Sequence, residues 1–188
     1  MAAESKGRVK GGAIQSRLAF VREHGGEEAA GRVLARLSEE DRKACGRALA
    51  AAWYPFDLNE RLDDAIAAEM GMGDKVFILM GEKSAAHNLG STHRVFMTDR
   101  DPHGLLRRAA QIYQAYYDTG RREYERLGDH TAALRTYDSA TVSKHDCLTV
   151  VGWHRKAIEM CGGTNVRVTE TKCRARGDNV CEYVCEWA

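Results

Sequence analysis

The chain contains only two prolines in 188 residues, and no apolar run reaches the roughly 18 residues of a membrane-spanning helix. The scarcity of proline argues against a linker-rich chain, and the missing apolar run predicts that no segment spans a membrane. Neither sign of charge is in excess, because 28 Lys and Arg stand beside 27 Asp and Glu. Nucleic-acid-binding domains usually carry a basic excess, so we expect no nucleic-acid partner.

A secretory signal is also missing from the first twelve residues, which are polar and rich in Gly and Lys. We expect a flexible tail over residues 1–12, a single α+β domain over residues 13–188 and a cytoplasmic location. In that reducing compartment the six cysteines are thiols. Clustered reduced thiols favour a metal site over disulfides.

Two hydrophobic periodicities divide the chain. Helical spacing predicts helices over residues 12–25, 27–37, 38–52, 57–70, 74–89 and 99–118. Alternation then predicts strands over 120–126, 132–138, 166–172 and 180–187, with a helix over 143–160 between the second and third. The expected fold class is α+β, with N-terminal helices packed on an antiparallel sheet and a closing helix plus β-hairpin.

Four residues of this closing unit have the chemistry of a metal site. Cys147 lies in the first turn of the helix, Glu170 and Cys173 lie on one hairpin strand, and Cys181 begins the next strand. Three sulfurs and one carboxylate satisfy tetrahedral zinc without an open position, which would staple the hairpin to the helix. Glu170 and Cys173 have opposite strand parity, so the strand must bend or bulge before both can face one ion.

The alternative to a metal site is a set of small buried hydrophobic thiols, and spacing alone weighs the two equally. Cys161 lies fourteen residues beyond Cys147 on the same helix, roughly 21 Å away. Cys185 lies two pleats from Cys181, roughly 13 Å away. Neither can share one ion with the other four.

Several segments carry a family resemblance. The stretches from Cys147 to Trp153 and from Cys161 to Gly163, and a Glu-x-x-Cys motif at Glu170 followed by Gly-Asp-x-x-Cys, resemble the four-vinyl-reductase-type domain. Its superfamily includes phenol-responsive sensor domains, TRAPP vesicle-tethering subunits and haem nitric-oxide-binding domains. Other stretches, at 53–56, 101–108 and 116–120, resemble a myxobacterial paralogous family of uncharacterised proteins.

This resemblance implies an α+β fold, often dimeric through its helical face, and structural zinc completed by Cys147. It does not transfer a ligand. Phenol sensors use an upstream Trp, and no Trp lies between Trp53 and Trp153. For haem, His103 is a candidate axial ligand, but the family's propionate-clamping arginine motif is not evident, so we interpret His103 as a cap or surface residue.

Enzymatic signatures are missing, since the chain has no nucleophile elbow, phosphate loop or H-E-x-x-H motif. A Cys–His dyad of Cys147 with His145 or His154 stays open. His154 lies about two turns away, roughly 10 Å, which is too far for a direct hydrogen bond. His145 is better interpreted as an outer neighbour of the metal site. We therefore expect a non-enzymatic protein.

Two functional hypotheses remain. The first is a small-molecule sensor with structural zinc, which signals through a protein partner as a homodimer. It predicts a cavity for a small apolar or aromatic ligand, lined by Phe77, Tyr113, Tyr116 and Trp153. The second is a TRAPP-like interaction or scaffold module without a ligand. It predicts a filled core and an exposed partner surface.

Overall fold

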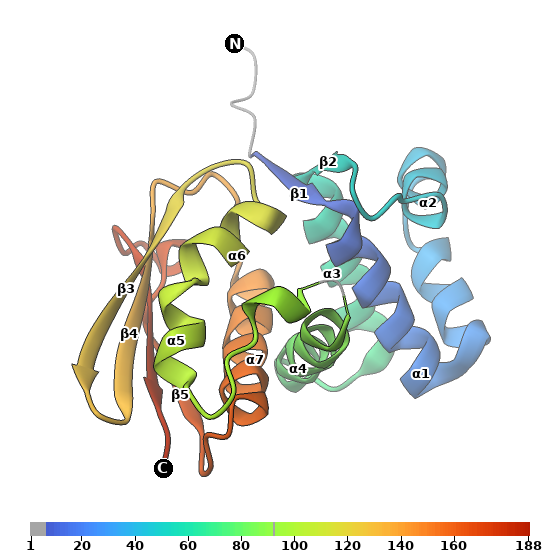
Figure 1. Ribbon diagram of the computed structural model, residues 1–188. Helices are drawn as coiled ribbons and strands as arrows, with labels where there is room; N and C mark the ends of the chain where they lie inside the picture. Colours follow the sequence, from blue (N-terminus) through green and yellow to red (C-terminus); the bar gives the residue numbers. More distant parts are fainter. Residues whose placement is uncertain (1–6, 92) are drawn as a thin grey trace.

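The structure is a computed structural model that describes residues 7–91 and 93–188. Figure 1 shows a helical half built from the early part of the chain and a second half built around a sheet. The elements are β1 (Arg8–Lys10), α1 (Gly11–Ala35), α2 (Glu39–Gly46), β2 (Trp53–Pro55), α3 (Phe56–Met70), α4 (Lys75–Gly90), η1 (Arg94–Phe96), α5 (Pro102–Arg107), α6 (Ala109–Tyr116), β3 (Arg121–Gly128), β4 (Thr131–Tyr137), α7 (Lys144–Met160), β5 (Arg167–Lys172), η2 (Arg174–Arg176) and β6 (Cys181–Glu186). None of the described helices is long and apolar enough to cross a lipid bilayer.

The N-terminal segment is built into the helical half. Strand β1 pairs antiparallel with β2, and Val9 is completely buried. The described part of the predicted tail over residues 1–12 is therefore a strand and a helix start, which corrects that prediction. Residues 1–6 of the predicted tail lie outside the described residues.

Three of the predicted helices in this half differ from the structure. Those over 12–25 and 27–37 form one helix, α1, with a kink at Gly26, where φ is 76°. The helix predicted over 38–52 is too long, because α2 ends at Gly46. The residues that follow turn back toward the start of α1. There the carbonyls of Ala52 and Ala50 accept hydrogen bonds from the amides of Gly11 and Gly12, at 2.9 and 3.0 Å.

The second half is a four-stranded antiparallel sheet in the order β3-β4-β6-β5. Helices α5, α6 and α7 lie on the side of the sheet that faces α4 (Figure 1). The helix predicted over 99–118 is two helices that meet at Arg108. The predicted α+β class, with helices and an antiparallel sheet, is confirmed.

Helices α4 and α7 join the two halves at a backbone contact made by two glycines. A Cβ atom on Gly81 would lie 2.0 Å from the carbonyl oxygen of Thr149, and one on Gly152 would lie 1.9 Å from that of Ile78. Neither position has room for a side chain. The two helices can therefore approach this closely only because both residues are glycine.

We expect Gly152→Ala to destabilise the fold by about 1–3 kcal/mol, because the added methyl group must push α4 and α7 apart. Gly31 is the matched control, since it lies within α1 and no atom comes within 4 Å of the place that a Cβ atom would take there. At that position alanine should stabilise the chain by roughly 0.5–1 kcal/mol through helix propensity. Urea unfolding of both variants measures the difference. Equal effects would contradict the close helix contact.

Candidate metal centre and ligand cavity

The four predicted metal ligands come together at one point. One ligand atom from each of Cys147, Glu170, Cys173 and Cys181 lies within 4.8 Å of the others. The Sγ atom of Cys147 is 3.8 Å from the Sγ atoms of both Cys173 and Cys181. A tetrahedral zinc ion with Zn–S bonds of about 2.3 Å places its sulfurs about 3.8 Å apart. The cluster therefore has the dimensions of a closed thiolate-rich metal site.

Helix α7 and the β5–β6 hairpin position these ligands. Ser143 caps α7 by accepting a hydrogen bond from the amide of Asp146 at 3.0 Å, which sets the first turn that carries Cys147. The register of β5 against β6 shifts between Glu170 and Lys172. This irregularity lies where the opposite parity of Glu170 and Cys173 required a bend or bulge.

The turn between the two hairpin strands holds the other pair of thiols. The amide of Cys173 donates to Oδ2 of Asp178 at 2.7 Å, and the amide of Arg174 donates to Sγ of Cys181 at 3.4 Å. Gly177 has a φ of 96°, the left-handed conformation that lets the turn close. These backbone groups orient Cys173 and Cys181 toward Cys147.

The electrostatics of the cluster favour a bound cation. Hydrogen bonding with the Cys147 thiol lowers the pKa of Cys181 to about 7 and also lowers the pKa of Cys173. The same hydrogen bonds, together with burial, raise the pKa of Cys147. Oε1 of Glu170 is buried and has no hydrogen-bond partner among the residues that the structure describes, while Oε2 accepts from Arg176 at 2.9 Å. A divalent cation would satisfy this oxygen and offset the charge of several thiolates.

The remaining cysteines of the described chain lie apart from this cluster. Cys161 ends α7, with its sulfur 3.7 Å from Oγ1 of Thr98, and Cys185 lies buried on β6. Cys45 lies in the helical core, where burial raises the pKa of its thiol to about 11. These three are buried apolar thiols.

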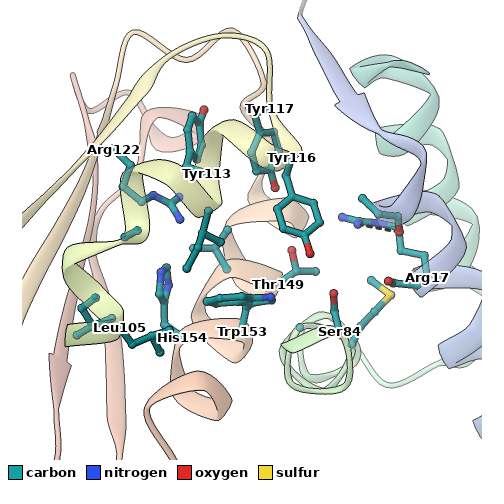
Figure 2. Close-up of a pocket in the computed structure, with 18 residues that line it drawn as sticks. Arg17, Ser84, Leu105, Tyr113, Tyr116, Tyr117, Arg122, Thr149, Trp153 and His154 are labelled. Carbon is teal, nitrogen blue, oxygen red and sulfur yellow. Dashed lines mark hydrogen bonds between the residues drawn. The ribbon is translucent and has the colours of Figure 1, made fainter. Parts of the chain in front are cut away.

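A cavity of about 70 Å³ lies between the two halves (Figure 2). Three of the four predicted lining residues border it, namely Tyr113 and Tyr116 of α6 and Trp153 of α7. The full lining consists of Ala13, Ser16, Arg17, Met80, Gly81, Ser84, Leu105, Leu106, Ala109, Ile112, Tyr113, Tyr116, Tyr117, Arg122, Thr149, Val150, Trp153 and His154. The wall is therefore mostly apolar and comes from α1, α4, α5, α6, β3 and α7.

Phe77, the fourth predicted lining residue, does not border the cavity. It is 1% exposed within the helical core, and its ring stacks on that of His145 at 4.1 Å. Phe77 shares a face of α4 with Gly81 and Ser84, both of which line the cavity, but it lies one turn earlier. At that turn α4 faces the start of α7.

A buried ion-pair cluster forms one side of the cavity. Nε of Arg17 donates to Oδ1 of Asp63 at 2.7 Å, and Nη2 donates to Oδ1 of Asp146 at 3.0 Å. The hydroxyl of Tyr117 donates to Oδ2 of Asp146 at 2.8 Å. Arg17, Asp63 and Asp146 are each at most 5% exposed. This cluster links α1 and α3 to Asp146, the residue that immediately precedes the candidate metal ligand Cys147.

The other polar groups of the wall have fewer partners. The hydroxyl of Tyr116 and Nδ1 of His154 are buried without a hydrogen-bond partner among the described residues. Burial, reinforced by the charge of Arg122, lowers the pKa of His154 to about 3, so its imidazole is neutral. Of the polar groups around the cavity, Tyr116 was expected from the sequence, whereas Arg17, Arg122 and His154 were not.

His103 has a structural position rather than the predicted cap or surface position. It is 7% exposed near the start of α5. Its Nε2 is hydrogen-bonded to the carbonyl oxygen of Asp129 at 2.9 Å, and its Nδ1 to the hydroxyl of Tyr124 at 2.8 Å. Both ring nitrogens are therefore engaged in joining α5 to the sheet.

Comparison with known proteins gives a fold but no family. No protein-family model and no curated protein matches the chain. The Fe(II) unliganded H-NOX protein from K. algicida matches with a TM-score of 0.73 and 14% identity, over 95% of this chain and 96% of that chain. The S. oneidensis H-NOX protein in its Fe(II)NO state matches with a TM-score of 0.72 and 15% identity, over 95% and 99%.

An NMR structure of an H-NOX domain from Shewanella oneidensis in the Fe(II)CO state gives a TM-score of 0.74 at 15% identity, over 95% of this chain and 98% of that chain. Identities this low show the fold alone. The haem-NO-binding part of the predicted resemblance is therefore confirmed as an H-NOX-like fold. The resemblance to four-vinyl-reductase and TRAPP proteins, and to the myxobacterial family, stays a prediction.

The H-NOX fold raises the question of haem, and the described residues do not fit it. Both nitrogens of His103 are hydrogen-bonded. The cavity of about 70 Å³ is far below the roughly 300–1,000 Å³ of most cofactor sites. The backbone contact at Gly81 and Gly152 also fixes the spacing of the two halves beside the cavity. The chain therefore combines an H-NOX-like fold with a small cavity and a cysteine cluster.

Proposed function

We propose that this chain is a non-enzymatic small-molecule sensor module with a structural zinc ion at Cys147, Glu170, Cys173 and Cys181. The observation that carries the proposal is the cavity between the two halves, because a ligand there touches α1 and α4 on one side and α5, α6, β3 and α7 on the other. Occupancy would shift the elements that line the cavity around the fixed contact of α4 with α7. The cavity supports a sensor over the TRAPP-like scaffold, for which we expect a filled core.

Side chains shared between the cavity and a smaller one beside the cysteine cluster support this proposal. A second cavity of about 20 Å³ shares Tyr113, Tyr117 and Arg122 with the first and extends to Cys147 and Cys181. The zinc ion would fix this end of α7, so that ligand-dependent strain passes to the outer surface of the helices. We propose that a protein partner reads this surface and that the module works as a homodimer in the cytoplasm.

The state of His154 supports a non-enzymatic role. A general base works best with a pKa near the working pH, whereas the pKa of His154 is about 3. The residue is also only 2% exposed. A neutral, enclosed imidazole suits ligand recognition better than proton transfer.

Native mass spectrometry of protein purified without chelator tests the proposal. We expect one zinc ion per chain, a dimer mass and, in part of the sample, a retained small organic molecule. A metal-free protein that keeps its fold would overturn the zinc assignment. A protein that retains no small molecule, and that binds neither small carboxylic acids nor their amides in solution, would overturn the sensor assignment.

A further inference from the structure

The cavity contains a buried cation without a carboxylate partner. Arg122 of β3 is 9% exposed, and its Nε donates to Oγ1 of Thr136 at 3.0 Å. Its guanidinium lies over the rings of Tyr113 and Tyr183, 4.8 and 5.6 Å from their centres. Within residues 7–91 and 93–188, no carboxylate forms an ion pair with Arg122, and Asp146 is engaged by other groups.

A buried, unpaired guanidinium favours the binding of an oxyanion. A buried charge without a partner is costly, and the planar guanidinium matches the two oxygens of a carboxylate. Figure 2 shows the guanidinium of Arg122 directed into the cavity from the sheet side. The unpartnered hydroxyl of Tyr116 and Nδ1 of His154 border the same space. Three polar groups with unused hydrogen-bonding capacity therefore border the same cavity.

The rest of the cavity wall determines the size and polarity of the uncharged part of the ligand. Apolar side chains dominate it, including Leu105, Ile112, Val150 and Trp153. The cavity volume of about 70 Å³ is about half of the roughly 150 Å³ that holds benzene in an apolar protein cavity. A short aliphatic chain fits directly, and a single ring fits if the partly open side widens. The single unpaired cation of Arg122 favours a ligand with one negative charge.

From these observations we infer that the cavity binds a small monocarboxylate, with its carboxylate held by Arg122 and its apolar body against Trp153 and helices α5 and α6. This inference rests on the proposed sensor function and names its ligand class. The competing assignment is that Arg122 balances the charge of the metal centre, because it also borders the smaller cavity that reaches Cys147 and Cys181.

Isothermal titration calorimetry with two pairs of probes tests the inference on the unaltered protein. Propionate and propionamide form the smaller pair, and benzoate and benzamide the larger; within each pair the shape is kept and the charge is removed. We expect at least one acid to bind about tenfold or more tightly than its amide, since a hydrogen-bonded ion pair replaces a neutral contact. A change in tryptophan fluorescence that is lost in a Trp153→Phe variant would place the bound probe in the cavity.

Two arginine variants provide the matched test. Arg122→Gln should lower the affinity for the acid about 10- to 100-fold and leave that for the amide unchanged. Arg121→Gln is the control, because the side chain of Arg121 is 54% exposed and pairs with Glu123 and Asp138. It should leave both affinities unchanged. Arg122→Lys keeps the buried charge and loses the planar fork, so it should fold and bind the acid several-fold more weakly.

The outcomes separate this inference from the proposed function. Amides that bind as tightly as the acids would overturn the carboxylate and leave the sensor cavity in place. If none of the four probes binds, the inference fails, and the sensor assignment fails with it only if native mass spectrometry also finds no retained small molecule. An Arg122→Gln protein that loses zinc in native mass spectrometry but keeps its affinity for the acid would assign Arg122 to the metal centre. If Arg122→Gln does not fold, the comparison of acid and amide on the unaltered protein decides.

Discussion

Replacing Cys181 with serine is expected to abolish zinc binding and lower the stability of the chain by about 4 kcal/mol. The figure follows from mass action, since a ligand at about 1,000 times its Kd stabilises the folded state by about 4 kcal/mol. For a chain of this length that corresponds to a fall in Tm of roughly 10 °C. The sulfur of Cys181 is 3.8 Å from that of Cys147, so its loss opens the closed ligand set.

Cys161→Ser is the matched control for this prediction. Cys161 is equally buried, lies at the end of the helix that carries Cys147 and is not part of the metal cluster. A serine there can keep the contact with the hydroxyl of Thr98, so zinc content and Tm should stay close to those of the unaltered chain. The measurements are metal analysis and thermal unfolding with and without chelator. Equal zinc content in the two variants would contradict the proposed metal site.

The meeting of the four candidate metal ligands could be predicted from the sequence because most of its geometry is local. All four residues lie within 35 residues, and a hairpin with a tight turn brings Cys173 close to Cys181 whatever the rest of the chain does. Strand parity even required the irregularity that the structure has next to Glu170. What the sequence left open was whether Cys147 approaches the hairpin, since that contact depends on how α7 packs on the sheet.

The lining of the cavity could be predicted only in part. Helical periodicity identifies which face of a helix is buried, but not which turn of that face meets the cavity. Tyr113, Tyr116 and Trp153 are on faces that meet the cavity. Phe77 is on the correct face of α4 but one turn too early, where His145 covers it. The position of the cavity along α4 is set by the contact of Gly81 with α7, a tertiary feature that no single helix encodes.

The buried arginines were missed for a different reason. Arg17 binds carboxylates that are 46 and 129 residues away in sequence, so no local pattern connects them. A signal was nevertheless present, because Arg17 falls on the apolar stripe of α1 between Ile14 and Val21. Arg122 likewise occupies an inward position of β3. A charge on an inward face indicates either a buried partner or a ligand.

Arg17→Met is expected to cost about 3–5 kcal/mol of stability, because it removes the cation from two buried carboxylates. Asp63 is completely buried and receives two hydrogen bonds from Arg17, at 2.7 and 3.1 Å. Arg32→Met is the control, since its pair with Glu69 at 2.6 Å involves a side chain that is 57% exposed. That variant should lose less than about 1 kcal/mol. Urea unfolding at pH 7 compares the two.

The pH dependence of the loss identifies its cause. Burial already raises the pKa of Asp63 above its ordinary value of 3.8, and Arg17 opposes this shift. Without Arg17 the folded-state pKa rises further. A group whose pKa is raised on folding contributes stability that is present below its unfolded pKa and is lost as pH rises through the folded value. The deficit of Arg17→Met should therefore be smaller near pH 5 than near pH 8, and Asp63→Asn in the same chain should restore part of the stability at the higher pH. If the stability deficit of Arg17→Met does not change with pH, the cause is the loss of packing around Arg17 and not the unbalanced charge of Asp63.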